Sequence, residues 1–233
     1  MPNIKSFKIE DNHVYYLFKR GKHEHIKALY ESGEIFMSTI DFIRTCDDNL
    51  ARTDKYDAIS KRTFSNNSIL TIAERQEDLD NGNGLELKTS RLVKNEFINT
   101  HGNIYCLTGI YTEDLLRNQT ELNFDTTTFG EDVIFIYKPK IFLERLVNEL
   151  KENGFDPIYN KVKYYSDDFS GDVGVFGKHE NFANQNEFRI YIRNPKNENV
   201  KINIGKLHDI AIMEKTVNFS LQDSKGRILK IKL

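Results

Sequence analysis

The sequence predicts a mixed α+β fold, with a strand-rich core of two sheets and flanking helices. Apolar and polar residues alternate in several short segments, most clearly at 187–193, as in strands that bury one face. Helical spacing of apolar residues occurs in only two places, near 26–30 and 139–150. Strands and helices do not alternate along the chain, so we do not expect a doubly wound parallel sheet.

In the first half, a helix containing Ile26 and Leu29 is expected to end at Gly33, which suits a left-handed C-cap. Asp41 is expected to cap a short helical turn. Residues 44–68 carry many charges and little periodicity, which predicts a long polar loop. The strands expected here lie at 4–9, 14–18, 34–38, 69–73, 85–93 and 104–110, with a turn at 81–84 between two of them.

In the second half, Pro139 is expected to begin a helix that Gly154 ends. Residues 111–131 are a polar stretch, and 166–184 are a predicted loop with one helical turn. The strands expected here lie at 133–137, 162–165, 187–193, 200–204, 210–213 and 228–233. With no repeat and no low-complexity linker, we expect a single domain over residues 1–233.

The composition excludes several classes of protein. Of the 233 residues 39% are hydrophobic and 29% charged, which is typical of a chain with a packed core. The net charge of −2 does not favour a basic nucleic-acid scaffold, although a local basic patch is compatible with it. Two cysteines, Cys46 and Cys106, are too few for a disulfide framework. Without a signal peptide or a long apolar run, we expect a cytoplasmic protein with no membrane partner.

The richest chemistry lies at the start of the strand at 187–193. A period of two would place Gln185, Glu187 and Arg189 on one face of this strand, opposite a core face that includes Phe188. An amide, a carboxylate and a guanidinium then lie side by side. The alternative is a solvated sheet face with an ion pair within the strand.

Gln185-x-Glu187 resembles the catalytic glutamate motif of mono-ADP-ribosyltransferases of the arginine–serine–glutamate class. Arg20, at the end of an early strand, and Thr108, on a middle strand, precede Glu187 in the chain order of that class. The family's Ser-Thr-Ser element is reduced here to Thr108 with Leu107 and Gly109, and Lys19 could replace Arg20. The resemblance implies an ADP-ribosyltransferase-like fold.

The resemblance implies that NAD+ is a co-substrate and that no metal is needed. Glu187 would stabilise the positive charge that develops on the ribose, Thr108 would support Glu187 by a hydrogen bond, and Gln185 would orient the acceptor. Arg20 offers a bidentate fork for the phosphates. The further residues expected to bind NAD+ are Phe36, Phe42, Arg52, Asp54 and Tyr56, and those expected to bind the acceptor are Lys178 and Arg189.

Residues 25–36 are similar to the opening of ADP-ribosyltransferase toxins that modify DNA or RNA, and most of 14–213 resembles a broad bacterial family found among phage-defence genes. These resemblances imply a toxin or anti-phage effector. It would transfer ADP-ribose to nucleic acid, with RNA favoured, or to protein. An antitoxin or another regulatory protein is an expected partner.

Two other functions remain open. A metal-independent ribonuclease could use Glu187, Arg189 and His179 as acid and base groups, without NAD+. A module that recognises a nucleotide or a phage protein would bind its ligand without turnover.

Overall fold

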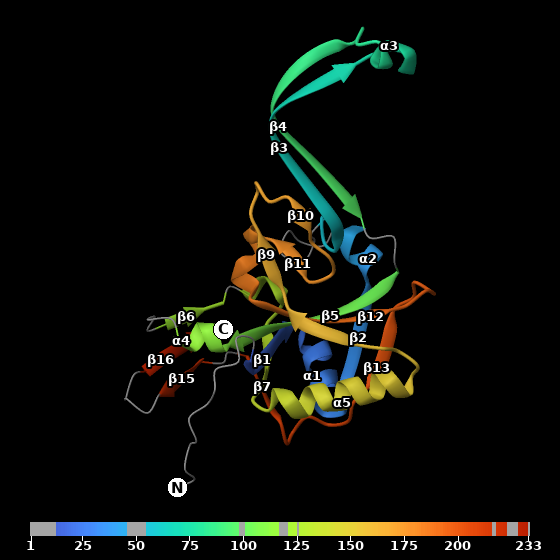
Figure 1. Cartoon of the computed structure of the whole chain (residues 1–233). Helices are drawn as coiled ribbons and strands as arrows, with labels where there is room; N and C mark the ends of the chain where they lie inside the picture. Colours follow the sequence, from blue (N-terminus) through green and yellow to red (C-terminus); the bar gives the residue numbers. More distant parts are fainter. Residues whose placement is uncertain are drawn as a thin grey trace.

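The computed structural model describes residues 13–45, 55–97, 101–116, 121–124, 126–215, 218–222 and 228–232. The fold is mixed α+β and rich in strands, which confirms the predicted class (Figure 1). The prediction of two packed sheets is wrong. The described residues form one eight-stranded sheet, two three-stranded sheets and one two-stranded sheet.

The eight-stranded sheet is built around β5, Gly102–Tyr111, which is buried at most of its positions. The order is β13-β2-β5-β1-β7-β14, and β12 pairs with both β5 and β8. The other strands of this sheet are β1 Val14–Gly21, β2 Glu34–Thr39, β7 Asp132–Ile136, β8 Ile158–Lys161, β12 Glu187–Arg193, β13 Val200–Asn203 and β14 Ala211–Glu214.

One edge of β5 is shared between two strands, and this division positions the site. The edge facing β12 is paired from Gly102 to Thr108. On the opposite edge, β1 pairs as far as Phe18 with Thr108, and β2 pairs only at Ile104 and Asn103. Among the described residues, this register leaves 105–107 with no strand beside them on that edge. The sheet therefore opens into a gap between β1 and β2.

Two helices close one face of this sheet. α1, His23–Ser32, and α5, Pro139–Glu152, bury apolar residues in a core that also contains Phe188. In Figure 1 both helices lie on the side of the sheet away from β3, Ile59–Ile72, and β4, Leu85–Phe97. Pro139 begins α5 and Gly33 caps α1 in the left-handed conformation, with φ 73°, as the sequence predicts.

A second, smaller core lies beside β1 and β7. Phe18 and Val133 pack there with Leu229 and Ile231. The surrounding elements are α4 Thr112–Leu116, β6 Glu121–Asn123, η1 Thr127–Phe129, β15 Asn218–Gln222 and β16 Ile228–Lys232. The strands β8 and β15 were not predicted. The segment of β8 is short and does not alternate, whereas β15 does alternate, with Phe219 and Leu221 facing the small core, so a usable signal was overlooked there.

A long hairpin projects from the body, and we call it the arm (Figure 1). It consists of β3 Ile59–Ile72, α3 Gln76–Asp80 and β4 Leu85–Phe97, and β10 Gly171–Asp172 pairs with its base. The predicted loop at 44–68 is therefore wrong from Ile59 onward, while 46–54 lie outside the described residues. Much of β3 is exposed, so it lacks the alternation that burial imposes on a sequence.

Smaller corrections concern local structure. α2, Ile40–Thr45, begins with the Phe42 N–H donating to the Thr39 hydroxyl, so Thr39 rather than Asp41 supplies the cap. This part of the chain begins with β9, Lys163–Tyr165. The expected loop at 166–184 also contains two short strands, β10 and β11 Gly177–His179, while η2, Glu180–Gln185, provides the helical turn that was expected there. The expected strand at 4–9 lies outside the described residues.

None of the helices in the described residues is both long and apolar enough to cross a membrane.

Candidate functional site

A cavity of about 580 Å³ lies at the gap in the sheet. Its walls come from the end of β1, from α1 and β2, and from residues 104–108 of β5. Lys178, Gln185 and Glu187 line it from the other side of β5. This volume is in the range of small-molecule sites, which are about 300–1,000 Å³. The gap thus brings together residues that lie as far apart in the chain as Phe18 and Glu187.

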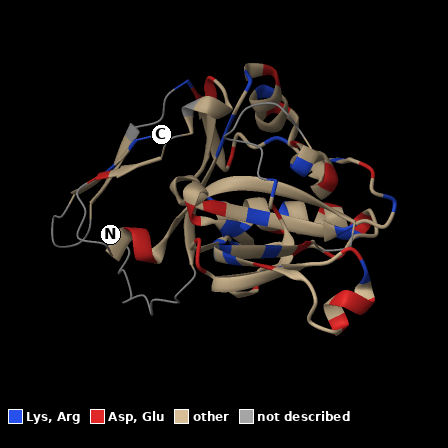
Figure 2. Cartoon of the chain, turned by 90° about the horizontal axis from the view of Figure 1, so that it is seen from above, with Lys and Arg blue, Asp and Glu red and all other residues tan. Residues whose placement is uncertain are grey.

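Cationic side chains gather around this cavity. Lys19, Arg20, Lys22 and Lys178 all line it. Seen from above, Lys and Arg segments lie close together on neighbouring strands of the body (Figure 2). Lys19 Nζ donates to the Cys106 carbonyl at 2.8 Å and lies 4.3 Å from the centre of the Tyr105 ring. It therefore satisfies a carbonyl that the gap leaves without a strand.

Arg20 lies across the gap from Cys106. If the pairing of β1 with β5 continued past Phe18, Arg20 would be opposite Cys106. Instead the Arg20 Nε donates to the Thr126 hydroxyl at 3.2 Å, and its Nη1 donates to the Gly130 carbonyl at 3.3 Å. These bonds hold the guanidinium at the cavity wall, where burial lowers its pKa.

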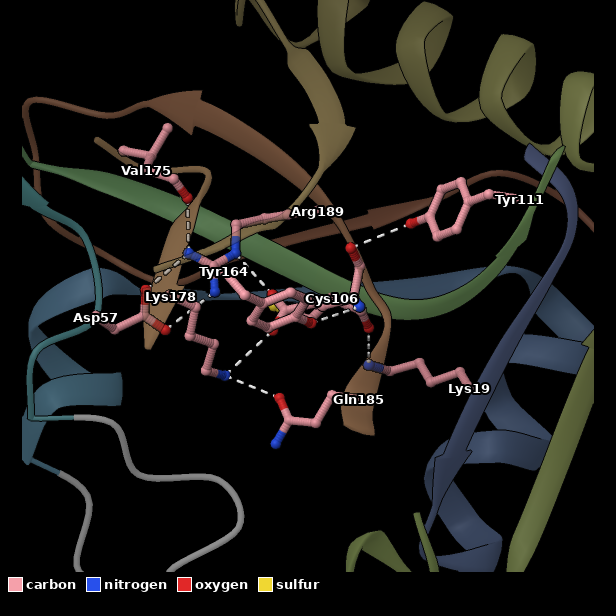
Figure 3. A network of polar contacts seen from close by, with 10 residues as sticks. Lys19, Asp57, Cys106, Tyr111, Tyr164, Val175, Lys178, Gln185 and Arg189 are labelled. Carbon is pink, nitrogen blue, oxygen red and sulfur yellow. Dashed lines mark hydrogen bonds and ion pairs between the residues drawn. The ribbon is translucent and has the colours of Figure 1, made fainter. Parts of the chain in front are cut away.

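Glu187 belongs to a buried polar network in which Lys178, Gln185 and Arg189 point toward one another (Figure 3). Arg189 Nε donates to its Oε1 at 2.7 Å and Lys178 Nζ donates to its Oε2 at 3.1 Å. Lys178 also donates to the Gln185 side-chain oxygen at 2.9 Å. Only 4% of Glu187 is exposed. The ion pair within the strand exists, but it is buried rather than solvated.

Asp57 completes the network from the chain segment just before the arm. Its two carboxylate oxygens accept from Arg189 Nη1 at 2.7 Å and Nη2 at 3.0 Å, a bidentate pair. Arg189 Nη1 also donates to the Val175 carbonyl, and the arginine is fully buried. Two anions, Asp57 and Glu187, thus balance two cations, Lys178 and Arg189, which is the condition for burying charge.

The network determines the protonation of its members. Burial alone would raise the pKa of Glu187, but the charges of Arg189 and Lys178 outweigh it and hold that pKa well below its usual range. Burial would lower the pKa of Lys178, but the charges of Glu187 and Asp57 raise it instead. Burial and the negative charge of Glu187 raise the pKa of Cys106 to about 12. At neutral pH Glu187 is therefore an anion and Cys106 a thiol.

The Glu187 backbone is held as firmly as its side chain. Its N–H donates to the Tyr164 hydroxyl at 2.9 Å, and its carbonyl accepts from the Tyr111 hydroxyl at 3.1 Å. Asn186, just before it, has a left-handed backbone with φ 42° and donates through its side chain to Gly109 and Asp114. This anchored bend directs Glu187 toward the gap.

The structure brings together most of the residues that the sequence singled out. Arg20, Thr108, Gln185, Glu187 and Lys178 line one cavity. Gln185 ends η2 and does not belong to β12, so the prediction that it shares a strand face with Glu187 is wrong. Thr108 lies directly opposite Glu187 in the sheet.

The expected hydrogen-bond support of Glu187 comes from a different residue. Among the described residues, the carboxylate bonds to Arg189, Lys178 and the Cys106 thiol. Thr108 is its cross-strand neighbour without such a bond. The cysteine two positions before Thr108 on the same face takes the role that we expected of the threonine.

The aromatic residues expected to bind NAD+ divide into two groups. Phe36 and Phe42 line the cavity and are about half exposed, at 51% and 53%. Tyr56 is exposed and does not line it. Arg189 lies behind Glu187 and not at the cavity wall, so it is not positioned to touch a ligand. Arg52 and Asp54 lie outside the described residues.

Sequence reasoning missed Asp57, Tyr164 and the role of Cys106. Asp57 lies 132 positions from Arg189, within a charged segment where nothing distinguishes it from its neighbours. Cys106 had a signal, since it shares a strand face with Thr108. His179 bonds to Asp167 and does not line the cavity, so the acid–base trio of the ribonuclease hypothesis is not assembled there.

Comparisons with family models, with curated proteins and with solved structures find no match for this chain.

Proposed function

We propose that the protein binds NAD+ in the cavity at the gap and transfers its ADP-ribose to a macromolecular acceptor, as a toxin or anti-phage effector. The observation that carries the proposal is that Arg20, Thr108, Gln185 and Glu187 line one cavity. These residues come from segments far apart in the chain, and they are the ones on which the resemblance to arginine–serine–glutamate ADP-ribosyltransferases depends.

The charged residues around the cavity suit both the pyrophosphate and the ribose of NAD+. Arg20 and Lys22 can hold the pyrophosphate, since guanidinium and ammonium groups bind phosphate oxygens strongly. β5 lies between β1 and β12, so these two strands are separated by twice the spacing of neighbouring strands, about 10 Å. Phosphates held by Arg20 would therefore leave the ribose within reach of Glu187.

Phe36 and Phe42 can cover a flat ring. Both are half exposed at the cavity, so stacking on nicotinamide or adenine would bury aromatic surface that is now in water. Such stacking would fix the orientation of the nucleotide relative to Glu187.

In the reaction, the bond between the ribose C1′ and the nicotinamide nitrogen breaks, and the electron pair leaves with nicotinamide. The acceptor nucleophile then bonds to C1′ and releases its proton to water. Glu187, ionised at neutral pH, can accept a hydrogen bond from a ribose hydroxyl and stabilise the positive charge on the sugar. Its lowered pKa makes it a poor base, so its role is electrostatic.

A second candidate is a nucleotide-binding module without turnover. Both carboxylate oxygens of Glu187 already have cationic partners, Arg189 and Lys178. This pairing reduces the negative charge that Glu187 can offer to a sugar cation. The same cationic cavity would still bind a nucleotide.

The test is transfer of label from radiolabelled NAD+ into the RNA, DNA and protein fractions of a cell extract, with nicotinamide release measured alongside. We expect label in one fraction for the wild-type protein and a loss of at least a hundredfold in Glu187→Gln, within the range for an electrostatic catalytic group. Glu180→Gln is the matched control. It makes the same chemical change at an exposed carboxylate outside the cavity and is expected to keep full activity.

The outcomes separate the two candidates. If NAD+ raises the melting temperature of the wild-type protein but neither label transfer nor nicotinamide release occurs, the protein is a binding module. If NAD+ has no effect on melting, label or nicotinamide, the proposed function is wrong. Circular dichroism of Glu187→Gln checks that loss of activity is not loss of the fold.

A further inference from the structure

Among the residues that the structure describes, the arm has an unpaired edge. Its sheet has the order β10-β3-β4, so β4 is an outer strand along its whole length. β10 covers the other edge of the arm only at Lys61 and Arg62. Beyond that point the arm is a ribbon of two strands that extends away from the body (Figure 1). Such an isolated ribbon is marginally stable in water, and three or more strands are needed for independent stability.

The distal arm also exposes apolar side chains on one face. Leu70 pairs with Leu87, and Ile72 pairs with Leu85, so all four lie on the same face. Between 42% and 63% of each is exposed. Exposed apolar residues beside an unpaired edge are typical of a surface that pairs with another chain.

The sequence of β4 is complementary to itself. If two copies pair β4 with β4 in antiparallel fashion, about a twofold axis midway between Glu86 and Lys94, Glu86 lies opposite the partner's Lys94. In the same register Leu87 lies opposite the partner's Val93. Symmetry repeats both pairs on the other side of the axis. The two residues of each pair are an even number of positions apart along β4. Because side chains alternate between the two faces of a strand, both members of a pair lie on the same face of the joined sheet.

We propose that β4 is a dimerisation edge whose partner is a second copy of this chain. Pairing would convert two ribbons into one four-stranded antiparallel sheet, which has enough strands for independent stability. The charges disfavour a nucleic-acid partner for the arm, because its tip carries five acidic residues and one arginine. The tip residues are Glu74, Arg75, Glu77, Asp78, Asp80 and Glu86. This inference is independent of the proposed function.

The test is the mass of the protein in solution, measured by sedimentation equilibrium over a wide concentration range. The wild-type chain should form a dimer of twice 27.2 kDa that dissociates on dilution. Glu86→Lys places two cations opposite each other at both pairs, and Lys94→Glu does the same with two anions. Each variant is expected to weaken the dimer about tenfold or more.

The decisive measurement is the mass of a mixture of the two charge-reversed variants. In an equimolar mixture of Glu86→Lys and Lys94→Glu chains, both pairs join opposite charges, so a heterodimer should form with wild-type affinity. The double variant, with both changes in one chain, should also dimerise. Glu77→Lys reverses a charge on α3 outside the register and is the matched control, expected to leave the dimer unchanged.

Three results would overturn the proposal. One is a wild-type chain that stays at 27.2 kDa at every concentration. Another is a dimer that both single variants leave intact, because the interface would then lie elsewhere. The third is failure of the mixed and double variants to recover dimerisation while circular dichroism shows them folded.

Discussion

Arg189 supports a residue of the cavity wall without lining the cavity itself. Its guanidinium is fully buried and bonds to Asp57, Glu187 and the Val175 carbonyl. Arg189 bonds to one oxygen of Glu187 and Lys178 to the other, so Arg189 helps to fix the direction of that carboxylate. We therefore regard Arg189 as a positioning residue and Glu187 as the residue that would meet the ligand.

Removing one member of the buried Asp57–Arg189 pair should be costly. Asp57→Ala leaves the guanidinium without its bidentate partner and is expected to lower the free energy of unfolding by about 3–5 kcal/mol. The double variant Asp57→Ala with Arg189→Met removes both charges and should recover part of that loss. Urea unfolding of the two single variants and the double variant measures the coupling. If the double variant loses as much free energy of unfolding as the two single variants together, the pair is not coupled.

The low pKa of Glu187 predicts a loss of stability in acid. Unfolding returns this carboxyl to an ordinary pKa of about 4.3, so the unfolded chain binds a proton that the folded chain does not. The contribution is complete above that pH and is lost as the pH falls below it. The free energy of unfolding of the wild-type protein should fall more steeply below about pH 4.3 than that of Glu187→Gln, by up to about 1.4 kcal/mol per pH unit. If the free energies of unfolding of the two proteins fall equally steeply in acid, this prediction is wrong.

The junction between α1 and β2 depends on a close backbone contact. Gly33 ends α1 with φ 73°, and a Cβ there would lie 2.1 Å from the Gly205 carbonyl oxygen. The Ile204 N–H donates to the Gly33 carbonyl, so the two segments are bonded at this point. The glycine thus joins β2, one wall of the cavity, to the segment after β13.

Gly33→Ala and Gly154→Ala form a matched pair for this contact. Both glycines follow helices with positive φ, 73° and 82°, but a Cβ at Gly154 meets no described atom within 4 Å. Gly154→Ala should cost about 1 kcal/mol for the left-handed backbone alone. Gly33→Ala should cost clearly more, because the Gly205 backbone must also move. Thermal unfolding of both variants tests this, and equal melting temperatures would refute the contact argument.

The body and the arm are expected to be separable. The contacts that tie the arm to the body lie near its base, including Arg91 with Asp167 and the Phe64 N–H with Ser170. The two walls of the cavity belong to the body, and Asp57 precedes the arm. Losing the distal arm should therefore affect self-association and leave the site intact.

Replacing residues 67–90 with Asn-Gly would close the hairpin beyond the Asn66–Arg91 pair with a favoured two-residue turn. The shortened chain should keep the free energy of unfolding of the wild-type body to within about 1 kcal/mol, because surface changes away from the core are small. It should also lose the dimer. Urea unfolding and sedimentation check the two statements. A body that no longer folds would show that the arm supports it.

Local patterns were sufficient for most helices and strands near the core. Pro139 and Gly33 marked helix ends, and the alternation at 187–193 marked β12, because burial of one face leaves its period in the sequence. The arm was misjudged at 59–68, since an exposed ribbon imposes no such period. Gln185 was misplaced because Asn186 turns the chain just before the strand.

The amino-acid sequence by itself determined the α+β class and the chain order of Arg20, Thr108 and Glu187. It could not determine that β5 has a divided edge, that Asp57 clamps Arg189, or that Cys106 and not Thr108 bonds to Glu187. These features depend on pairs of residues up to 132 positions apart. Hydrophobic period and turn chemistry act over a few neighbouring residues, whereas the pairing of charges across strands is settled only when the sheet closes.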